Sequence, residues 1–401
     1  MTSYRHPVTL LLIVTLAWVD ALSAQSPTGR PSSPQRPAGQ GQGIGISPTE
    51  RDVHYGPHER NVLDFWQAKS EKPTPVLIAI HGGGFRQGDK GIGGWLLKDC
   101  LDSGISVAAI TYRFSQQAIA PAPFEDGALA VQFIRSRAKQ WNLDPTRVAA
   151  TGGSAGAGIS LWLGFHDDMA DPNNEDPIRR ESTRLTCMAV TEGQTSYDPR
   201  FIRSLFPEKE VYRIPPVGQL FGVDVNDLDH LPAEKYKLFE ACSPINLLSK
   251  DDPPALLVYS RPIGAEVTEL NVGIHHPRFG KALKEKMDEL KIPCEVDAAG
   301  QRLGGGTATR VTAFLKEHFG MPLTDADRQP APPLVVFSAA DRQGPSEQFR
   351  YWDRDHDGKL SREEVPESIR DVFDQVDTDH DGWISPQEDR SFRQRIQGRP
   401  G

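Results

Sequence analysis

Clusters of basic residues are missing from this 401-residue chain, whose formal net charge is −9. Proteins that bind nucleic acid usually carry a face rich in Lys and Arg, so the composition argues against a nucleic-acid partner. A CxxC pattern is also missing, because the four cysteines lie far apart at Cys100, Cys187, Cys242 and Cys294. Each is expected to be a buried free thiol, although export would permit disulfides and four cysteines allow three pairings.

Beyond the N-terminus, no apolar run is long enough to cross a bilayer, and the N-terminus itself has the features of a signal peptide. Arg5 and His6 lie in a short polar segment, Val8 to Val19 is apolar apart from two threonines, and Leu22 to Ala24 offers a cleavage site. A bilayer span needs ~20 apolar residues. We predict cleavage after Ala24, no membrane span afterwards, and export to the periplasm, the cell surface or the medium. An uncleaved membrane anchor is the alternative.

Composition divides the chain into five segments. Residues 1–24 are the predicted signal peptide, and residues 25–46 are a leader rich in Pro, Gly, Ser and Gln that is expected to be disordered. Residues 47–321 alternate apolar runs with amphipathic helical patterns. Residues 322–343, again rich in Pro, Asp and Ala, are interpreted as a linker, and residues 344–397 as a small acidic module.

The long middle segment has the pattern of an α/β sheet. Strands are predicted at residues 62–66, 76–80, 105–112, 147–151, 187–190, 255–260 and 294–297. Helices are predicted at residues 125–141, 155–165, 277–290 and 307–318. Strands that alternate with helices favour parallel pairing.

Two segments of the acidic module match the EF-hand loop, which needs oxygen ligands at positions 1, 3, 5, 7, 9 and 12 and Gly at position 6. The predicted ligands are Asp353, Asp355, Asp357, Lys359, Ser361 and Glu364 in loop one, and Asp377, Asp379, Asp381, Trp383, Ser385 and Glu388 in loop two. Lys359 and Trp383 would bind through their backbone carbonyls. Two Ca²⁺ ions are predicted, and Asp-rich turns without metal are the alternative.

The two loops are expected to pair with each other through Leu360 and Ile384, which both occupy position 8. Loop one carries the basic residues Arg354, Lys359 and Arg362, whereas loop two carries none. Because these positive charges repel a cation, loop two is predicted to bind calcium more tightly.

A candidate nucleophile lies in the segment Gly152 to Gly156, between a short apolar strand and a helix. Glycines around Ser154 allow the sharp turn of a nucleophile elbow. The segment His81 to Phe85, of sequence HGGGF, directly follows another strand. The amides of Gly83 or Gly84 and of Ala155 are the expected donors to an oxyanion.

Together these two motifs resemble the α/β-hydrolase superfamily, in its esterase and lipase branch with HGGG and GxSxG motifs. The resemblance covers roughly residues 50 to 320, and the acidic module is similar to the EF-hand superfamily. It implies a mostly parallel eight-stranded sheet with helices on both faces, a small all-α calcium module, and a Ser–acid–His triad. The implied activity is hydrolysis of carboxylic esters, either small molecules or esters linked to polysaccharide.

The remaining triad members do not follow the family's pattern. The acid is expected after the strand at residues 255–260, where Glu266 and Glu269 are available, and Glu266 is assigned the role. The histidine is expected near Leu303, but no histidine occurs between His276 and His318. Without a base, a serine hydroxyl is a poor nucleophile.

His276 is therefore assigned as the base, and its neighbour His275 is the alternative. His276 also suits a role at the start of the following helix, and His318 suits packing in its own helix. The predicted function is an exported, calcium-binding, esterase-like hydrolase with an atypical or incomplete triad. The alternative is an inactive hydrolase-fold protein that binds a ligand or partner. Residues 201–238 are expected to form a cap whose apolar residues Phe206, Val211, Leu220 and Phe221 narrow the entry.

Overall fold

The computed structural model describes residues 46–298, 305–324, 327, 349, 353, 357–365 and 373–397. The predicted signal peptide and most of the leader lie outside these ranges, as does the segment 299–304. The predicted domain boundaries stay predictions. Among the described residues, no helix combines the length and the apolar character that crossing a bilayer requires.

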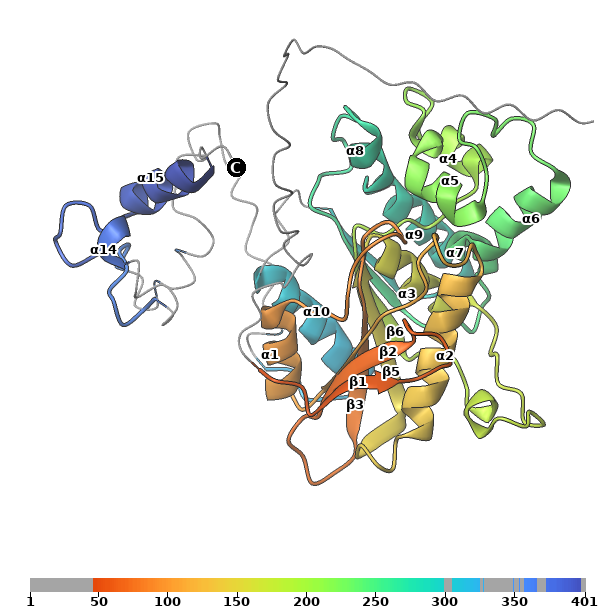
Figure 1. Ribbon diagram of the computed structural model, residues 1–401, viewed down its shortest axis with the longest axis horizontal. Coiled ribbons are helices and arrows are strands. Elements are labelled where there is room, and N and C mark those ends of the chain that lie inside the picture. The colour runs from red at the N-terminus through yellow and green to blue at the C-terminus, as the bar shows by residue number, and fades with distance from the viewer. Residues whose placement is uncertain are drawn as a thin grey trace, which may run out of the picture. The chain divides into compact units, whose positions relative to one another are not determined.

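One eight-stranded sheet dominates the fold (Figure 1). Its strands are β1 (Glu50–His54), β2 (Val62–Trp66), β3 (Thr74–Ile80), β4 (Ser106–Ile110), β5 (Leu143–Gly153), β6 (Cys187–Thr191), β7 (Ala255–Val258) and β8 (Cys294–Asp297). They lie in the order β1-β2-β4-β3-β5-β6-β7-β8. Pairing is antiparallel from β1 to β2 and from β2 to β4, and parallel elsewhere. The predicted mostly parallel sheet of eight strands is confirmed.

Helices connect the strands and cover both faces of the sheet (Figure 1). They are α1 (Gly94–Asp102), α2 (Ala122–Ser136), α3 (Ala155–Phe165), α4 (Pro199–Leu205), α5 (Pro215–Phe221), α6 (Ala233–Cys242), α7 (Pro244–Leu247), α8 (Leu270–Ile274), α9 (Arg278–Leu290) and α10 (Gly305–His318). Two 3₁₀ turns are η1 (Pro177–Arg180) and η2 (Val211–Arg213), and the acidic module contributes α14 (Phe373–Val376) and α15 (Pro386–Gln397).

Successive side chains of the central strands point to opposite faces of the sheet, and each face has its own apolar core. Every residue of β3 is buried. Val76, Ile78 and Ile80 enter a large core with residues of α2, α3 and α9. Leu77 and Ala79 face a smaller core with residues of α1 and α10. Successive side chains of a strand point to opposite faces, so a continuous apolar run is what a strand covered on both faces requires.

Two elements lack the apolar pattern that would have predicted them. In β1 the side chains are exposed or half-buried, so no apolar alternation marks the strand. In α1 only Leu97 and Cys100 are buried.

The helix predicted at 125–141 begins at Ala122 and ends at Ser136. Trp141 lies beyond it and stacks on Phe65 with ring centroids 4.3 Å apart.

All four cysteines are buried free thiols, as expected from their spacing. Burial raises the pKa of Cys100, Cys242 and Cys294 to about 12. These thiols therefore stay protonated near neutral pH and take part in packing.

A buried ion pair joins the end of β4 to α2. The Asp126 carboxylate accepts hydrogen bonds from the backbone N–H of Arg113 at 2.8 Å and from its guanidinium Nη2 at 2.7 Å. The Asp126 side chain is 3% exposed and that of Arg113 28% exposed. Loss of one partner of such a pair leaves the other charge unpaired in a low-dielectric environment.

Substitution of Asp126 by Ala should therefore lower the free energy of unfolding of this domain by about 3 kcal/mol. The matched control is Asp102→Ala, which removes an exposed pair with Lys98 on α1. That change should cost about 0.5 kcal/mol or less. Urea unfolding of both variants measures the difference, and equal losses would contradict the structural role of Asp126.

Candidate active site and calcium-binding loops

Ser154 occupies a strained turn between β5 and α3. Its backbone has φ 53° and ψ −117°, a conformation that costs free energy in a non-glycine residue. The turn is closely packed, since a Cβ on Gly156 would lie 2.0 Å from the carbonyl oxygen of Ile80. The Ser154 N–H donates to the Thr191 carbonyl at 3.0 Å. The strand end, the helix start and β6 together hold the predicted nucleophile in place.

The Ser154 hydroxyl contacts His275, which directly follows α8. The distance from Ser154 Oγ to His275 Nε2 is 2.7 Å, and His275 Nδ1 lies 2.8 Å from the Asn271 carbonyl oxygen. Because a carbonyl only accepts, Nδ1 carries the hydrogen in the neutral imidazole. Nε2 is then free to accept the hydroxyl hydrogen of Ser154. This is the geometry that a nucleophile and its general base require.

His276, the assigned base, contacts other residues than Ser154 through both of its ring nitrogens. It is fully buried, and its Nε2 lies 3.0 Å from the Ala265 carbonyl oxygen. Its Nδ1 accepts the backbone N–H of Arg278 at 3.2 Å, in the first turn of α9. Both ring nitrogens are thus engaged in local structure, and the structure brings the neighbouring histidine to Ser154 instead.

The other predicted triad positions also lie apart from this contact. Glu266 is exposed and makes no hydrogen bond or ion pair to any residue in the described ranges. His318 packs against Phe314 within α10, with ring centroids 4.3 Å apart. The segment that contains Leu303 is outside the described residues.

The predicted oxyanion loop lies directly against the elbow. A Cβ on Gly82 would be 2.7 Å from the Gly153 carbonyl oxygen and 3.6 Å from Ser154 Cβ. Gly83 and Gly84 have φ of 105° and 61°, which glycine adopts without strain. Within the described part of the chain, the amides of Gly83, Gly84 and Ala155 donate no hydrogen bond. Unpaired amides beside a nucleophile suit an anion.

His81 shapes this loop. Its ring stacks on Tyr112 with centroids 4.4 Å apart, and its Nδ1 lies 2.7 Å from the Gly82 carbonyl oxygen. Burial lowers its pKa to about 4, and the nearby positive charge of Arg60 acts in the same direction. A neutral ring donates from Nδ1 to Gly82, so the His81 side chain stabilises the loop without carrying charge.

The segment between β6 and β7 forms the expected cap, and α5 lies beside the oxyanion loop. A Cβ on Gly84 would be 3.3 Å from Pro216 Cβ. The four apolar cap residues expected to narrow the entry are instead at most 1% exposed, namely Phe206, Val211, Leu220 and Phe221. They form the interior of the cap, because a short helical cap needs its own apolar packing.

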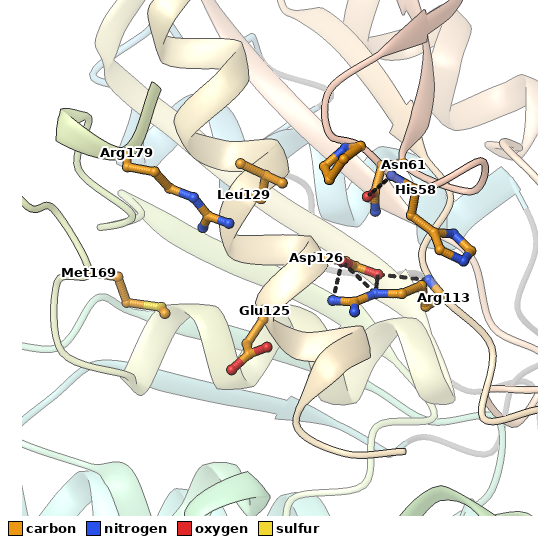
Figure 2. Close-up of a pocket in the computed structure, with 9 residues that line it drawn as sticks. His58, Asn61, Arg113, Glu125, Asp126, Leu129, Met169 and Arg179 are labelled. Carbon is orange, nitrogen blue, oxygen red and sulfur yellow. Dashed lines mark hydrogen bonds and ion pairs between the residues drawn. The ribbon is translucent and has the colours of Figure 1, made fainter. Parts of the chain in front are cut away.

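A cavity of about 420 Å³ lies elsewhere, around the Arg113–Asp126 pair (Figure 2). Its walls come from the loop between β1 and β2, from α2, and from the segment that carries Met169 and Arg179. Neither Ser154 nor His275 lines it. The side chain of Asp126 is already paired with Arg113 there, so this cavity is distinct from the catalytic candidate.

In the acidic module, the two calcium loops pair as predicted. Leu360 and Ile384 form an antiparallel bridge, with N–O distances of 3.0 and 2.9 Å. Gly358 and Gly382 have φ of 82° and 88°, the left-handed conformation that position 6 requires. A small core surrounds the bridge and comprises Phe349, Leu360, Val365, Phe373, Val376 and Ile384.

The donor groups of these loops fit a hard cation. One carboxylate oxygen of Asp353 accepts from the Gly358 N–H at 3.1 Å, and one of Asp377 accepts from the Gly382 N–H at 3.0 Å. The other oxygen of each aspartate is buried without a hydrogen-bond partner in the described parts. Ligand atoms of Asp377, Asp379 and Glu388 lie within 4.8 Å of one another. Oxygen donors in this arrangement suit Ca²⁺.

The last ligand of each loop has the same environment. Glu364 and Glu388 each accept a hydrogen bond from a serine hydroxyl at 2.8 Å, from Ser361 and Ser385 respectively. Burial opposes ionisation of Glu388, but hydrogen bonds from Ser385 and Thr378 outweigh it and lower the pKa to about 2. Glu388 is therefore ionised at neutral pH. Of the predicted ligands, Asp355 lies outside the described residues.

Comparisons with known proteins agree with this architecture. Residues 63–261 match the family described as BD-FAE, and residues 347–365 and 369–388 match the family described as EF hand. Esterase LipQ of Mycobacterium tuberculosis (strain ATCC 25618 / H37Rv) is 26% identical over 52% of this chain and 47% of its own length. Probable carboxylic ester hydrolase LipM of the same organism is 26% identical over 71% of this chain and 64% of its own.

The chain thus spans between about half and two thirds of the length of these relatives. A solved structure of a truncated carbohydrate esterase from gut microbiota matches 68% of this chain and 96% of its own, with TM-score 0.52 and 18% identity. At that identity the likeness concerns the fold.

The neutral His81 side chain gives a testable pH dependence. In the unfolded chain the His81 imidazole gains a proton near its ordinary pKa of 6.5. In the folded chain its pKa is about 4, so it gains the proton only at lower pH. The contribution of neutral His81 to the free energy of unfolding is therefore complete above its pKa in the unfolded chain. It is lost as the pH falls towards its pKa in the folded chain. Urea unfolding across this window should show a falling free energy, and His81→Gln should make the decline shallower. An identical decline in the variant would contradict this role.

Proposed function

Because residues 63–261 form an α/β-hydrolase domain of the BD-FAE family and the C-terminal segment carries EF hands, we propose that this chain is an exported calcium-binding esterase. It hydrolyses carboxylic esters, on small molecules or on polysaccharide, through Ser154. The observation that carries the proposal is the 2.7 Å contact between Ser154 Oγ and His275 Nε2. The predicted N-terminal signal supports export.

The reaction follows from the positions of these groups. His275 Nε2 accepts the proton of Ser154 as Oγ attacks the acyl carbonyl carbon. The amides of Gly83, Gly84 and Ala155 donate to the oxygen that becomes negative, where each such donor typically contributes ~2.7–4 kcal/mol. His275 then gives the proton to the departing alkoxide. A water molecule, deprotonated by the same imidazole, hydrolyses the acyl-serine and restores the site.

Calcium in this proposal has a structural or attachment role. Two ions would be held, one in each loop, and the predicted extracellular location supplies free calcium. Extracellular modules bind with Kd on the order of 10⁻⁴ to 10⁻³ M. No residue of the proposed catalytic site belongs to the module. When bound, the ions would neutralise the clustered carboxylates and join each loop's first and last ligands.

Active-site labelling tests the esterase proposal. Fluorophosphonate should label the wild type and should not label Ser154→Ala. His275→Ala should lower kcat for a small aryl ester by roughly 10³-fold or more, because the hydroxyl loses its base. His276→Ala should act mainly by lowering stability, with kcat per labelled site largely retained.

A wild type that neither reacts with fluorophosphonate nor turns over esters would favour the alternative, a hydrolase-fold protein that binds a ligand or partner. Loss of turnover in His276→Ala with retention in His275→Ala would show that the wrong histidine is assigned as base.

Separate titration of the two loops tests the calcium proposal. Arg362 of loop one pairs with Asp374, so the uncompensated basic residue described in that loop is the exposed Lys359. Loop two should therefore bind more tightly. In calorimetry, Glu388→Gln should remove the tighter binding event and Glu364→Gln the weaker one. Equal or reversed affinities would contradict this order.

A further inference from the structure

The base of the proposed site directly follows a helix that is too short to hold its own position. Helix α8 has 5 residues, of which only Gly273 and Ile274 are buried. Helices of this length are unstable in isolation, so packing against other elements has to hold them in place. The Asn271 carbonyl of the same helix orients the His275 ring. The distance from this ring to Ser154 therefore depends on what α8 packs against.

Neighbours at the end of β6 and in the cap hold α8. The side chain of Gln194, in the turn after β6, donates from Nε2 to the Ile274 carbonyl at 2.9 Å. On the cap side, a Cβ on Gly273 would lie 2.3 Å from Cγ2 of the fully buried Val211 in η2. The close approach of α8 to the cap thus needs glycine at this position. A shift of the cap would remove the support on this side of the helix.

Arg278, the first residue of α9, joins the cap to the segment that carries His275. Its Nη1 donates to the carbonyl oxygen of Leu205, the last residue of α4, at 3.0 Å. The carbonyls at a helix end have no partner within their own helix, and a cation suits them. The guanidinium also pairs with the Glu208 carboxylate and lies over the Phe206 ring, 5.2 Å from its centroid. One side chain therefore contacts the cap through a hydrogen bond, an ion pair and an aromatic ring.

These contacts differ in how far water reaches them. The Arg278 side chain is 31% exposed and that of Glu208 45%, so water weakens the ion pair. Phe206 is 1% exposed and packs on Phe279 of α9 with ring centroids 5.5 Å apart. The hydrogen bond to the Leu205 carbonyl and the contact with Phe206 are therefore expected to matter more than the charge of Glu208.

We propose that Arg278 is a positioning residue of this site, which holds the cap against α8 and thereby keeps His275 in place; the inference rests on the proposed function. In the described part of the chain, its guanidinium contacts the cap and neither Ser154 nor His275. It therefore acts through α8. With the cap in place, Nε2 of His275 lies 2.7 Å from Ser154 Oγ. Release of the cap would let α8 move, and a misplacement of about 1 Å in such a contact can lower a rate roughly 10²-fold.

Fluorophosphonate labelling and ester turnover test this role in the full chain. In Arg278→Gln the side chain is shorter and uncharged, so it loses the Leu205 carbonyl. The labelling rate and kcat should each fall roughly tenfold or more, with a smaller change in KM, because the base is displaced while the oxyanion loop keeps its own contacts. Arg278→Lys keeps the charge and a donor group, and should recover part of both losses.

The matched control is Arg203→Gln, which removes an exposed ion pair with Asp229 inside the cap. It should leave kcat within about twofold of the wild type. Gly273→Ala alters the same interface with Arg278 intact, because the added methyl group meets Val211, and it should lower kcat and the labelling rate. Val211→Ala in the same chain makes room for that methyl group and should restore part of both rates.

Hydrogen–deuterium exchange provides a measurement that needs no turnover. In Arg278→Gln, peptides from residues 270–277 and from α4 should exchange faster than in the wild type, whereas peptides from β5 and α3 should not change. Arg203→Gln should leave residues 270–277 unchanged. A rise in exchange across β5 and α3 as well, in proportion to the lost stability, would show a merely structural role and overturn the inference.

Unchanged labelling rates in Arg278→Gln and Gly273→Ala would also overturn it. Should Arg278→Gln not fold, the Gly273→Ala chain with and without Val211→Ala decides, and no loss, or a loss without recovery, contradicts the inference. If the wild type shows no Ser154-dependent labelling but exchange at residues 270–277 rises selectively in Arg278→Gln, the proposed function fails while the docking of the cap by Arg278 stands.

Discussion

The catalytic half of this molecule depends on the close approach between the β5–α3 turn and the end of β3. A side chain on Gly156 would overlap the Ile80 carbonyl, so the backbone passes there only because the residue is glycine. Beside this contact the Ser154 backbone has φ 53°, and the elbow lies against the loop that starts at His81. The candidate nucleophile and the candidate oxyanion donors are therefore neighbours. The strain at Ser154 is compensated by the sheet, helix and cap packed around it.

Around that contact, hydrogen bonds to backbone carbonyls orient the side chains of the site. The Asn271 carbonyl fixes the tautomer of His275, and the turn after β6 secures the backbone on either side of the Ser154–His275 contact. His81 stabilises the oxyanion loop as a neutral ring. The histidine that contacts Ser154 thus directly follows α8 and does not come from the segment near Leu303, where it was expected.

Different interactions stabilise the calcium module. Its core is small, and its two loops are joined by the Leu360–Ile384 bridge. Buried aspartate oxygens without partners at the first position of each loop are unfavourable until a cation satisfies them. Metal binding and folding of the module are therefore expected to be coupled. The hydrolase domain has one apolar core on each face of its sheet and does not need a bound cation for its packing.

Much of this protein was determined by its sequence alone. Apolar runs specified the central strands, glycines with Ser154 specified the elbow, and the spacing of oxygen donors specified the calcium loops, because these features act over a few neighbouring residues. Tertiary structure alone decided between His275 and His276. The two are adjacent, and only the direction of each ring after α8 separates the imidazole that contacts Ser154 from a buried packing residue.

The same reason applies to the cap. Phe206 and Phe221 were expected to line an entry but pack inside the cap. Local pattern predicts which residues are apolar or chemically able. Which face each one presents, and to which partner, depends on contacts between segments far apart in the chain.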